Sequence, residues 1–353
     1  MTETNQKIID MILKNASVNE ISKVTGLSNK QLFYRLNMLK IKGYNFSRKY
    51  YYDGEITYKL QKGFEKQKEF CLLTRPKDTE FKAVFISDLH LSNKYDRVDL
   101  LNQIYDFCVK DGINIIINGG DIIDGFLGYD SLKKFKTIDD QIDYLLKVYP
   151  YDKNILNFTC LGNHDYDVLE KVGQNLETIL LTKRHDIVPL GYGVGRLKIK
   201  NDEIIVRHPK TPMIEPLGPI SEGLMLTGHT HKSQNIVHGN LVNIYLSSLS
   251  DLKSNNNSED CSLPGFVKAT INFQKGIFNI GTFEQYIFAD KIYKVNESQY
   301  ELYRGKNINQ DVVKYEEDRI PYSEELENVE KVLTKDYKGL SQIERFNKRY
   351  GRE

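Results

Sequence analysis

Imidazole and carboxylate side chains recur in this sequence at the ends of apolar, strand-like runs. Five of the seven histidines lie at such ends, whereas His185 and His238 do not. The polar residues that close the runs are Asp88-Leu89-His90, Gly120-Asp121, Gly162-Asn163-His164-Asp165, His208 and Gly228-His229-Thr230-His231. Imidazole nitrogens with carboxylate and amide oxygens bind divalent metals, and histidine also exchanges protons near neutral pH. These residue types predict metal-assisted catalysis that includes a proton transfer.

The spacing inside two of these groups is informative. In extended chain, residues two apart point to the same side, so Asp88 and His90 can chelate one cation. His229 and His231 follow a glycine and can reach two different metal ions from one loop. Taken alone, the first pair also fits a surface turn, and Asp121 also fits a helix cap.

The stretch from Gly162 to Asp165 is central to this interpretation. It follows an apolar run that ends at Phe158 and precedes a helical pattern from Val168 to Leu181. A turn at the carboxyl end of a strand is where open α/β sheets bind ligands. There Asn163 can offer an oxygen to a cation, His164 can transfer a proton, and Asp165 can orient His164.

Alternating strand and helix patterns indicate how the groups are positioned. A strand over 81–86 is followed by a helix over 99–110 and a strand over 113–118, which is a β-α-β order. Right-handed crossovers bring both strand ends to one edge of a sheet. We therefore expect an α/β body that begins at residue 81.

Composition describes an ordinary soluble chain. Of its 353 residues, 40% are hydrophobic and 27% are charged, and no apolar run approaches the length of about 18 residues that spans a bilayer. The four cysteines form no C-x-x-C pair, which argues against a disulfide framework or a zinc ribbon. We expect a cytoplasmic protein without a membrane partner.

The first segment differs from the rest in charge and pattern. Residues 1–75 contain 14 Lys and Arg against 7 Asp and Glu, which favours contact with a polyanion. Apolar spacing predicts a helix-turn-helix over residues 1–60, whose recognition helix runs from Ser28 to Leu39. The outer face of that helix carries candidate nucleic-acid contacts at Asn29, Lys30, Gln31, Tyr34 and Arg35.

A β-hairpin is predicted after this helix. Tyr44 to Tyr52, a turn at Asp53-Gly54, and Glu55 to Leu60 complete the pattern of a winged helix. Arg48 and Lys49 on the hairpin are further candidates for DNA contact. A solvated lysine-rich face, or a module that docks a protein, would give the same pattern.

Two segments carry less information. Residues 61–80 are charged and lack sustained periodicity, so we expect a linker. Residues 284–353 form a charged C-terminal extension with one expected helix from Ser323 to Leu333. That extension is expected to be a partner-docking or self-association helix, a clamp on the body, or a tail.

In this order, the groups resemble those of the calcineurin-like metallophosphoesterase superfamily, and the resemblance implies a catalytic body over residues 81–283. The resemblance implies a two-layer β-sandwich flanked by helices, with later strands around 241–246, 265–273 and 277–283. It also implies a dinuclear metal centre. One ion would be held by Asp88, His90, Asp121 and His231, and the other by Asp121, Asn163, His208 and His229. Asp121 would bridge the ions, and His164 would lie near the phosphate.

Details within the groups narrow the expected activity. Asp165, with no arginine after it, departs from the pattern of the serine/threonine protein phosphatases. The groups look more like those of SbcD-like nucleases, cyclic-nucleotide phosphodiesterases and small bacterial phosphodiesterases. Mixed nitrogen and oxygen ligands without thiolate favour Mn²⁺, Fe or Zn²⁺. Two hypotheses remain: a nuclease delivered to DNA by the winged helix, and a DNA-binding regulator whose body senses or hydrolyses a small phosphorylated metabolite or cyclic nucleotide.

Overall fold

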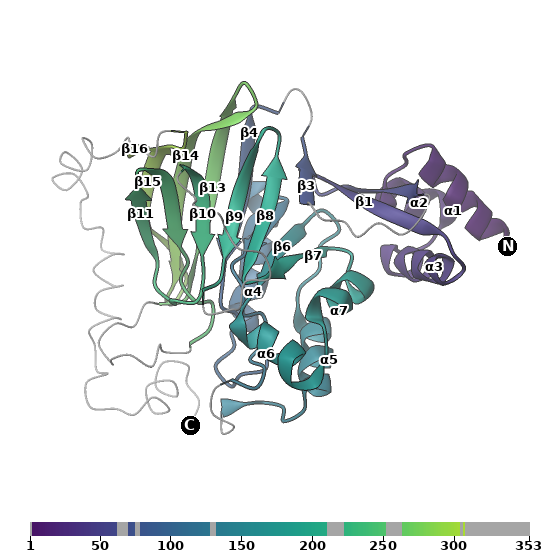
Figure 1. The fold of residues 1–353 in the computed structure, drawn as a ribbon, viewed down its shortest axis with the longest axis horizontal. Helices are drawn as coiled ribbons and strands as arrows, with labels where there is room; N and C mark the ends of the chain where they lie inside the picture. The colour runs from purple at the N-terminus through teal and green to yellow at the C-terminus, as the bar shows by residue number, and fades with distance from the viewer. Residues whose placement is uncertain are drawn as a thin grey trace.

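A computed structural model describes residues 2–61, 70–74, 78–127, 132–209, 222–251, 263–303 and 306–307. These residues form seven helices and two eight-stranded sheets (Figure 1). The helices are α1 (Glu3–Leu13), α2 (Val18–Thr25), α3 (Asn29–Ile41), α4 (Val98–Asp111), α5 (Ile138–Val148), α6 (Asn163–Val172) and α7 (Leu176–Lys183). The mixed α/β class predicted from the sequence is confirmed.

The strands divide into a first sheet, A, and a second sheet, B. Sheet A has the order β11-β12-β10-β9-β8-β3-β1-β2, and sheet B has the order β16-β15-β14-β13-β4-β5-β6-β7. The strands of sheet A are β1 (Asn45–Tyr51), β2 (Ile56–Gln61), β3 (Phe70–Leu73), β8 (Val194–Ile199), β9 (Asp202–Arg207), β10 (Glu222–Thr227), β11 (Gln234–His238) and β12 (Asn240–Tyr245). Those of sheet B are β4 (Glu80–Ile86), β5 (Ile115–Asn118), β6 (Leu156–Leu161), β7 (Ile187–Tyr192), β13 (Gly265–Gln274), β14 (Ile277–Phe288), β15 (Ile292–Glu301) and β16 (Lys306–Asn307).

Side-chain alternation along β4 explains the layering. Ala83 and Phe85 face sheet A in a core shared by the two sheets, while Val84 and Ile86 face the helices. Because successive residues of a strand point to opposite faces, β4 is apolar on both. Sheet B is therefore the middle layer, with α4 to α7 on its outer face and sheet A on its inner face.

The helices of the front segment, defined here as residues 2–61, begin at polar caps. Ser17 and Ser28 each form a capping box, with Glu20 and Gln31 respectively, at the starts of α2 and α3. Such caps satisfy backbone N–H groups that a helix leaves unpaired at its first turn. The helix predicted from Ser28 and the hairpin of β1 and β2 are both confirmed.

Part of the expected linker over 61–80 is a strand. β3 pairs in parallel with both β1 and β8, so sheet A runs without a break from the hairpin into the body. Across the two sheets, the rings of Tyr50 and Phe158 pack with centroids 5.7 Å apart. The expectation of a simple linker is wrong for 70–73, because these residues supply backbone hydrogen bonds that the hairpin and β8 both need.

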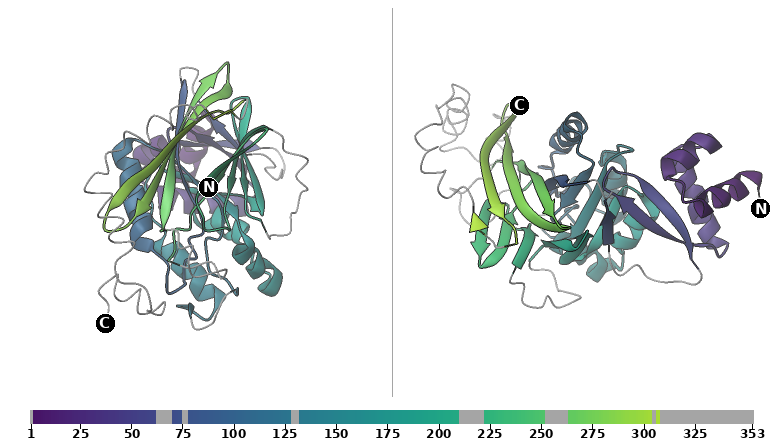
Figure 2. Two further views of the ribbon diagram at one scale, coloured as in Figure 1. Left: turned by 90° about the vertical axis from the view of Figure 1, so that its left-hand side faces the viewer. Right: turned by 90° about the horizontal axis from the view of Figure 1, so that it is seen from above.

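The front segment also meets the body through helix α3. Figures 1 and 2 show α1 to α3 at one end of the molecule, carried on β1. The contacts lie at residues that precede β6 and β7: Asn29 Nδ2 donates to Tyr151 Oη at 3.2 Å, and Asn37 Nδ2 donates to the Thr182 carbonyl at 3.0 Å. The turn at Gly54 presses on Asn154, because a Cβ at residue 54 would lie 1.9 Å from the Asn154 carbonyl oxygen.

Sheet B extends past residue 283, where the body was expected to end. β14 continues to Phe288, and β15 pairs with it along most of its length. The helix expected from Ser323 to Leu333 lies outside the described residues. Within the described part of the chain, no helix is long and apolar enough to cross a membrane.

Candidate metal centre

The predicted metal-binding side chains come together where the two sheets meet. β4, β5 and β6 are parallel, so the residues that follow them share one edge of sheet B. His208 follows β9, and His229 and His231 follow β10, which are neighbouring parallel strands of sheet A. Loops from both sheets thus meet at carboxyl ends of strands, as expected.

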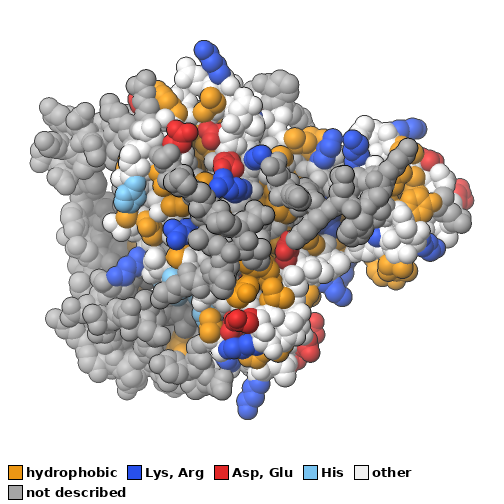
Figure 3. All heavy atoms as spheres, in the orientation of Figure 1, with side chains coloured by type: hydrophobic (Ala, Val, Ile, Leu, Met, Phe, Trp, Pro, Cys, Tyr) orange, Lys and Arg blue, Asp and Glu red, His pale blue; other side chains and the backbone are white. Residues whose placement is uncertain are grey.

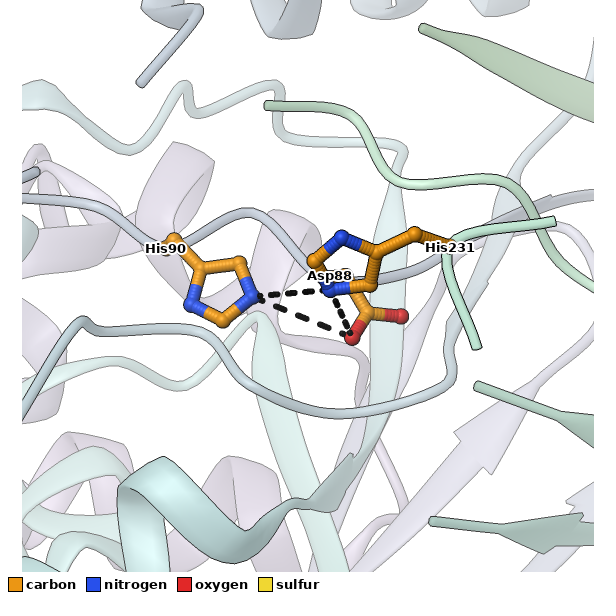
Figure 4. Close-up of side chains that lie close together, drawn as sticks. All are labelled: Asp88, His90 and His231. Atoms are coloured by element: carbon orange, nitrogen blue, oxygen red, sulfur yellow. Dashed lines mark hydrogen bonds and ion pairs between the residues drawn. The ribbon is translucent and has the colours of Figure 1, made fainter. Parts of the chain in front are cut away.

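One group of candidate ligands consists of Asp88, His90 and His231. His231 Nε2 lies 3.2 Å from Asp88 Oδ1 and 3.2 Å from His90 Nε2 (Figure 4). His90 Nε2 is 3.9 Å from the same carboxylate oxygen. Two imidazole nitrogens and a carboxylate oxygen therefore converge on one point.

A second group forms around Asp121. Its Oδ2 lies 3.1 Å from His208 Nε2, and that nitrogen lies 3.1 Å from Asn163 Oδ1. The candidate ligand atoms of Asp121, His208 and His229 all lie within 4.8 Å of one another. Asp121 Oδ2 is also 3.9 Å from His90 Nε2, so one carboxylate adjoins both groups.

The backbone of these loops adopts an uncommon conformation. φ is positive at five of the candidate ligands: Asp88 (54°), His90 (43°), Asp121 (51°), His229 (75°) and His231 (58°). Non-glycine residues seldom occupy this left-handed region, and such strain concentrates at functional sites. Glycine is required beside them, since a Cβ at Gly162 would lie 2.1 Å from Asp121 Oδ1.

Buried charge in the centre suits a cation. Burial would raise the pKa of Asp88, but His231 and His208 outweigh it and lower the pKa to about 2. Burial lowers the pKa of His208, whereas the adjoining Asp121 carboxylate raises it to about 10. A divalent cation could replace the imidazolium proton as the partner of that carboxylate, because metal ligands must be deprotonated. The donor set, nitrogen and oxygen without sulfur, fits Mn²⁺, Fe or Zn²⁺.

His164 lies beside the centre and is held by a backbone carbonyl. Its Nδ1 lies 2.7 Å from the carbonyl oxygen of Asp124, and its backbone N–H donates to Asp121 Oδ1 at 2.9 Å. The His164 and His90 rings pack edge to face at 4.6 Å. One His164 ring nitrogen also lies within 4.8 Å of ligand atoms of His90 and Asp121. These three side chains are therefore close enough together to bind one metal ion.

Asp165 does not orient His164, contrary to expectation. Its buried carboxylate accepts the backbone N–H groups of Gly162 at 2.8 Å, Ile122 at 3.1 Å and Ile123 at 3.2 Å. Burial, followed by repulsion from Asp121, raises its pKa to about 7. Asp165 therefore ties the loop after β5 to the start of α6.

Asp124 is the site residue that the sequence interpretation missed. Its side chain is buried, with 1% exposed. Asp124 Oδ1 accepts a hydrogen bond from Asn93 Nδ2 at 3.0 Å and lies 3.8 Å from His90 Nδ1. Burial raises its pKa to about 6. A second aspartate three residues after Asp121 was the available signal, but its carbonyl contact with His164 depends on the folded loop.

The residues proposed to contact nucleic acid separate into two sets. Lys30, Gln31, Tyr34 and Lys49 are exposed, although Gln31 Oε1 also accepts the Ser28 N–H at 2.9 Å in the capping box. Asn29 bonds to Tyr151, and Arg35 Nη1 donates to Asn5 Oδ1 at 3.1 Å. Both side chains are thus engaged within the protein.

Arg48 is misassigned by the sequence interpretation. It is 7% exposed, donates to the Leu181 carbonyl at 2.8 Å, and lies 4.8 Å from the centroid of the Phe33 ring. Alternation along β1 turns Arg48 inward and Lys49 outward. Arg48 therefore fastens the front segment to the body and is inaccessible to a phosphate backbone.

Comparison with known proteins gives one family. Residues 81–260 match the model for calcineurin-like phosphoesterases. No curated protein matches the chain.

Several solved structures are similar at low identity. The phosphoesterase YfcE from E. coli has 14% identity and a TM-score of 0.39, over 62% of this chain and 98% of that one. Vacuolar protein sorting 29 from Cryptosporidium parvum has 14% identity and a TM-score of 0.35, over 64% and 100%. A novel archaeal phosphodiesterase has 10% identity and a TM-score of 0.35, over 59% and 100%.

Proposed function

This chain belongs to the calcineurin-like phosphoesterase family, and from that premise we propose that it hydrolyses phosphodiesters at the centre between its two sheets. Membership makes it a metal-dependent phosphoesterase. The observation that supports a diester substrate is the bond from His164 Nδ1 to the Asp124 carbonyl, beside the candidate ligands. One alcohol oxygen of a diester departs when the bond is hydrolysed, and as an alkoxide it leaves poorly until it is protonated.

Up to two divalent cations have candidate ligands here. Asp88, His90 and His231 would hold one, Asn163, His208 and His229 would hold the other, and Asp121 would contact both. When bound, such cations neutralise charge on phosphate oxygens and activate water for attack. Mn²⁺ is our first choice, with Fe or Zn²⁺ as alternatives.

His164 would supply the proton for the leaving oxygen. A backbone carbonyl only accepts hydrogen bonds, so His164 Nδ1 must carry a hydrogen in this contact. Its other ring nitrogen, Nε2, is then the one that exchanges a proton. The Asp124 carbonyl fixes the ring so that this nitrogen can serve as a general acid.

Substrate preference tests the proposal directly. Purified protein stripped of metal and reloaded with Mn²⁺, Fe²⁺ or Zn²⁺ should hydrolyse bis-p-nitrophenyl phosphate faster than p-nitrophenyl phosphate. Cyclic nucleotides, single- and double-stranded DNA, RNA and phosphorylated metabolites would then be compared. A preference for the monoester with every metal would contradict the diester assignment.

We also propose that the exposed face of α3 contacts DNA. Lys30, Gln31 and Tyr34 remain exposed there, and Lys49 is exposed on β1. On the face drawn in Figure 3, the lysine and arginine side chains of the front segment, at the right, are spread out with hydrophobic side chains between them. They do not form one basic patch. DNA binding by this surface is therefore expected to be modest in affinity and to weaken as salt is added.

The position of α3 favours a regulator over a nuclease that cuts where it binds. Hydrogen bonds from α3 reach residues that precede β6 and β7, whereas His164 follows β6. The six residues of β6, at about 3.3 Å each, place the two ends of this strand about 20 Å apart. That distance is about six base pairs at 3.4 Å each, so DNA bound at α3 would not have its contacted bases at the metal centre.

A double variant tests whether DNA binding and diester hydrolysis take place at separate sites. Lys30→Ala with Lys49→Ala should weaken DNA binding and reduce its salt dependence by about one unit of slope per lost contact. Hydrolysis of bis-p-nitrophenyl phosphate should not change, and Lys110→Ala on α4 serves as the control. Under the nuclease hypothesis DNA cleavage falls with binding; under the regulator hypothesis binding is sequence-selective and cleavage is slight.

A further inference from the structure

Gln141 on α5 makes polar contacts that neither the sequence motifs nor the proposed mechanism uses. Its side chain is buried, with 1% exposed. Oε1 accepts the Gly125 N–H at 3.0 Å and the Ser92 hydroxyl at 2.9 Å, while Nε2 donates to the Gly125 carbonyl at 3.2 Å. One amide therefore ties the loop after β4 to the loop after β5.

Gly125 and His164 are connected through a single peptide unit. The Gly125 N–H and the Asp124 C=O belong to the same planar peptide, and the described residues contain no cis peptide bond. In a trans peptide these two groups point in opposite directions. Gln141 thus holds one side of the unit at 3.0 Å, and His164 Nδ1 holds the other at 2.7 Å.

Close packing leaves this peptide little freedom. Gly125 has φ of 60°, and a Cβ there would lie 2.5 Å from the His164 carbonyl oxygen. A rotation of the peptide would break both hydrogen bonds at once, and a buried amide without partners is costly. Hydrogen bonds in series also polarise one another, so the Gly125 N–H bond strengthens the carbonyl as an acceptor.

We propose that Gln141 is a positioning residue for His164, acting through the Asp124–Gly125 peptide. It sets the direction of the carbonyl that receives the His164 Nδ1 hydrogen, and so the direction in which Nε2 presents its proton. This inference rests on the proposed role of His164 as general acid. It adds a residue from α5, 23 positions before His164, to the determinants of leaving-group protonation.

Leaving-group dependence separates positioning from general structural support. Gln141→Leu removes the clamp, and diphenyl phosphate, with a poor leaving group, is compared with bis-p-nitrophenyl phosphate. The kcat for diphenyl phosphate should fall roughly ten- to a hundred-fold, the scale for losing an outer hydrogen-bond partner. The kcat for bis-p-nitrophenyl phosphate and the metal content should change little.

Two further variants guard against a folding defect. Gln141→Glu keeps an oxygen acceptor for the Gly125 N–H but loses the donor to the Gly125 carbonyl, so it should recover part of the activity that Gln141→Leu loses. Gln103→Leu, an exposed glutamine on α4, should leave both substrates unchanged. Melting temperatures of all three report whether the fold is intact.

A double variant decides the connection. In a His164→Ala background, Gln141→Leu should cause no further loss with diphenyl phosphate, because the group that it positions is gone. Equal losses for both leaving groups, or additive losses in the double variant, would overturn the inference. If His164→Ala itself shows no leaving-group dependence, the general-acid proposal fails instead, and the two failures are distinguishable.

Discussion

Asp121 Oδ2 and His208 Nε2 lie 3.1 Å apart, and both side chains are almost fully buried. Burial would raise the pKa of Asp121, but His208 and His164 outweigh it and hold the pKa far below the usual range. The carboxylate is therefore ionised and adjoins both ligand groups. It is the described carboxylate best placed to be shared by two cations.

Asp121→Asn should lower the metal content of both groups and abolish Mn²⁺-dependent turnover, because the neutral amide removes the shared charge. Elemental analysis of the purified variant, with activity on bis-p-nitrophenyl phosphate, provides the measurement. Asp106→Asn, an exposed position on α4, is the matched control. Full metal content in Asp121→Asn would rule out the shared-ligand role.

His164→Ala should retain metal while losing roughly 10²- to 10⁴-fold in kcat for a poor leaving group. The loss in kcat should be smaller for bis-p-nitrophenyl phosphate, because p-nitrophenolate leaves without being protonated. Paired rate and metal measurements check this expectation. Loss of metal with loss of rate would instead make His164 a ligand, a role its position near His90 and Asp121 allows.

Asp165→Asn should destabilise the loops without changing the leaving-group dependence. The variant amide keeps one acceptor but turns an NH₂ group toward backbone N–H donors of Gly162, Ile122 or Ile123. A loss of about 1–3 kcal/mol in unfolding free energy is expected for the unpaired groups. Denaturant unfolding measures it, and a change in leaving-group dependence like that of His164→Ala would restore the orienting role.

Arg48→Ala and Lys49→Ala should separate stability from DNA contact. Loss of the buried Arg48 leaves a cavity beside Phe33 and frees the Leu181 carbonyl, so about 3 kcal/mol of unfolding free energy should be lost. Lys49→Ala should change stability by less than about 0.5 kcal/mol while weakening DNA binding. Reversed outcomes would mean that β1 does not pack against the body as described.

His185 should make the stability of the folded protein fall in acid. Burial lowers its pKa to about 4, and its ring packs against Phe33 with centroids 5.3 Å apart. The unfolded chain takes up this proton near pH 6.5 and the folded protein only near pH 4, so stability should fall as pH drops through that window. Between about pH 6.5 and pH 4, the melting temperature of the wild type should drop relative to that of His185→Phe, which keeps a ring but does not titrate. Parallel curves would contradict the assignment.

Much of the metal centre could be predicted from the sequence because its signals are local. Asp88 and His90 directly follow the apolar run that forms β4, and Asn163 to Asp165 directly follow the run that forms β6. The left-handed backbone at Asp88 and His90, and not the period of a strand, sets the direction of their side chains. The cap at Ser28 is likewise local, so the start of α3 followed from a short motif. Each feature depends on residues only a few positions apart, where covalent geometry restricts the outcome.

What the sequence determined by itself is therefore the chemistry of the ligands and their order along the chain. Tertiary structure alone decided that Arg48 turns inward to Leu181, 133 residues away, and that Asp165 binds Ile122 and Ile123 rather than orienting His164. The clamp of Gln141 on Gly125 is of the same kind. The physical reason is that a buried polar group must find whichever partners the packed elements bring within hydrogen-bond distance, and strands and helices distant in sequence set those distances.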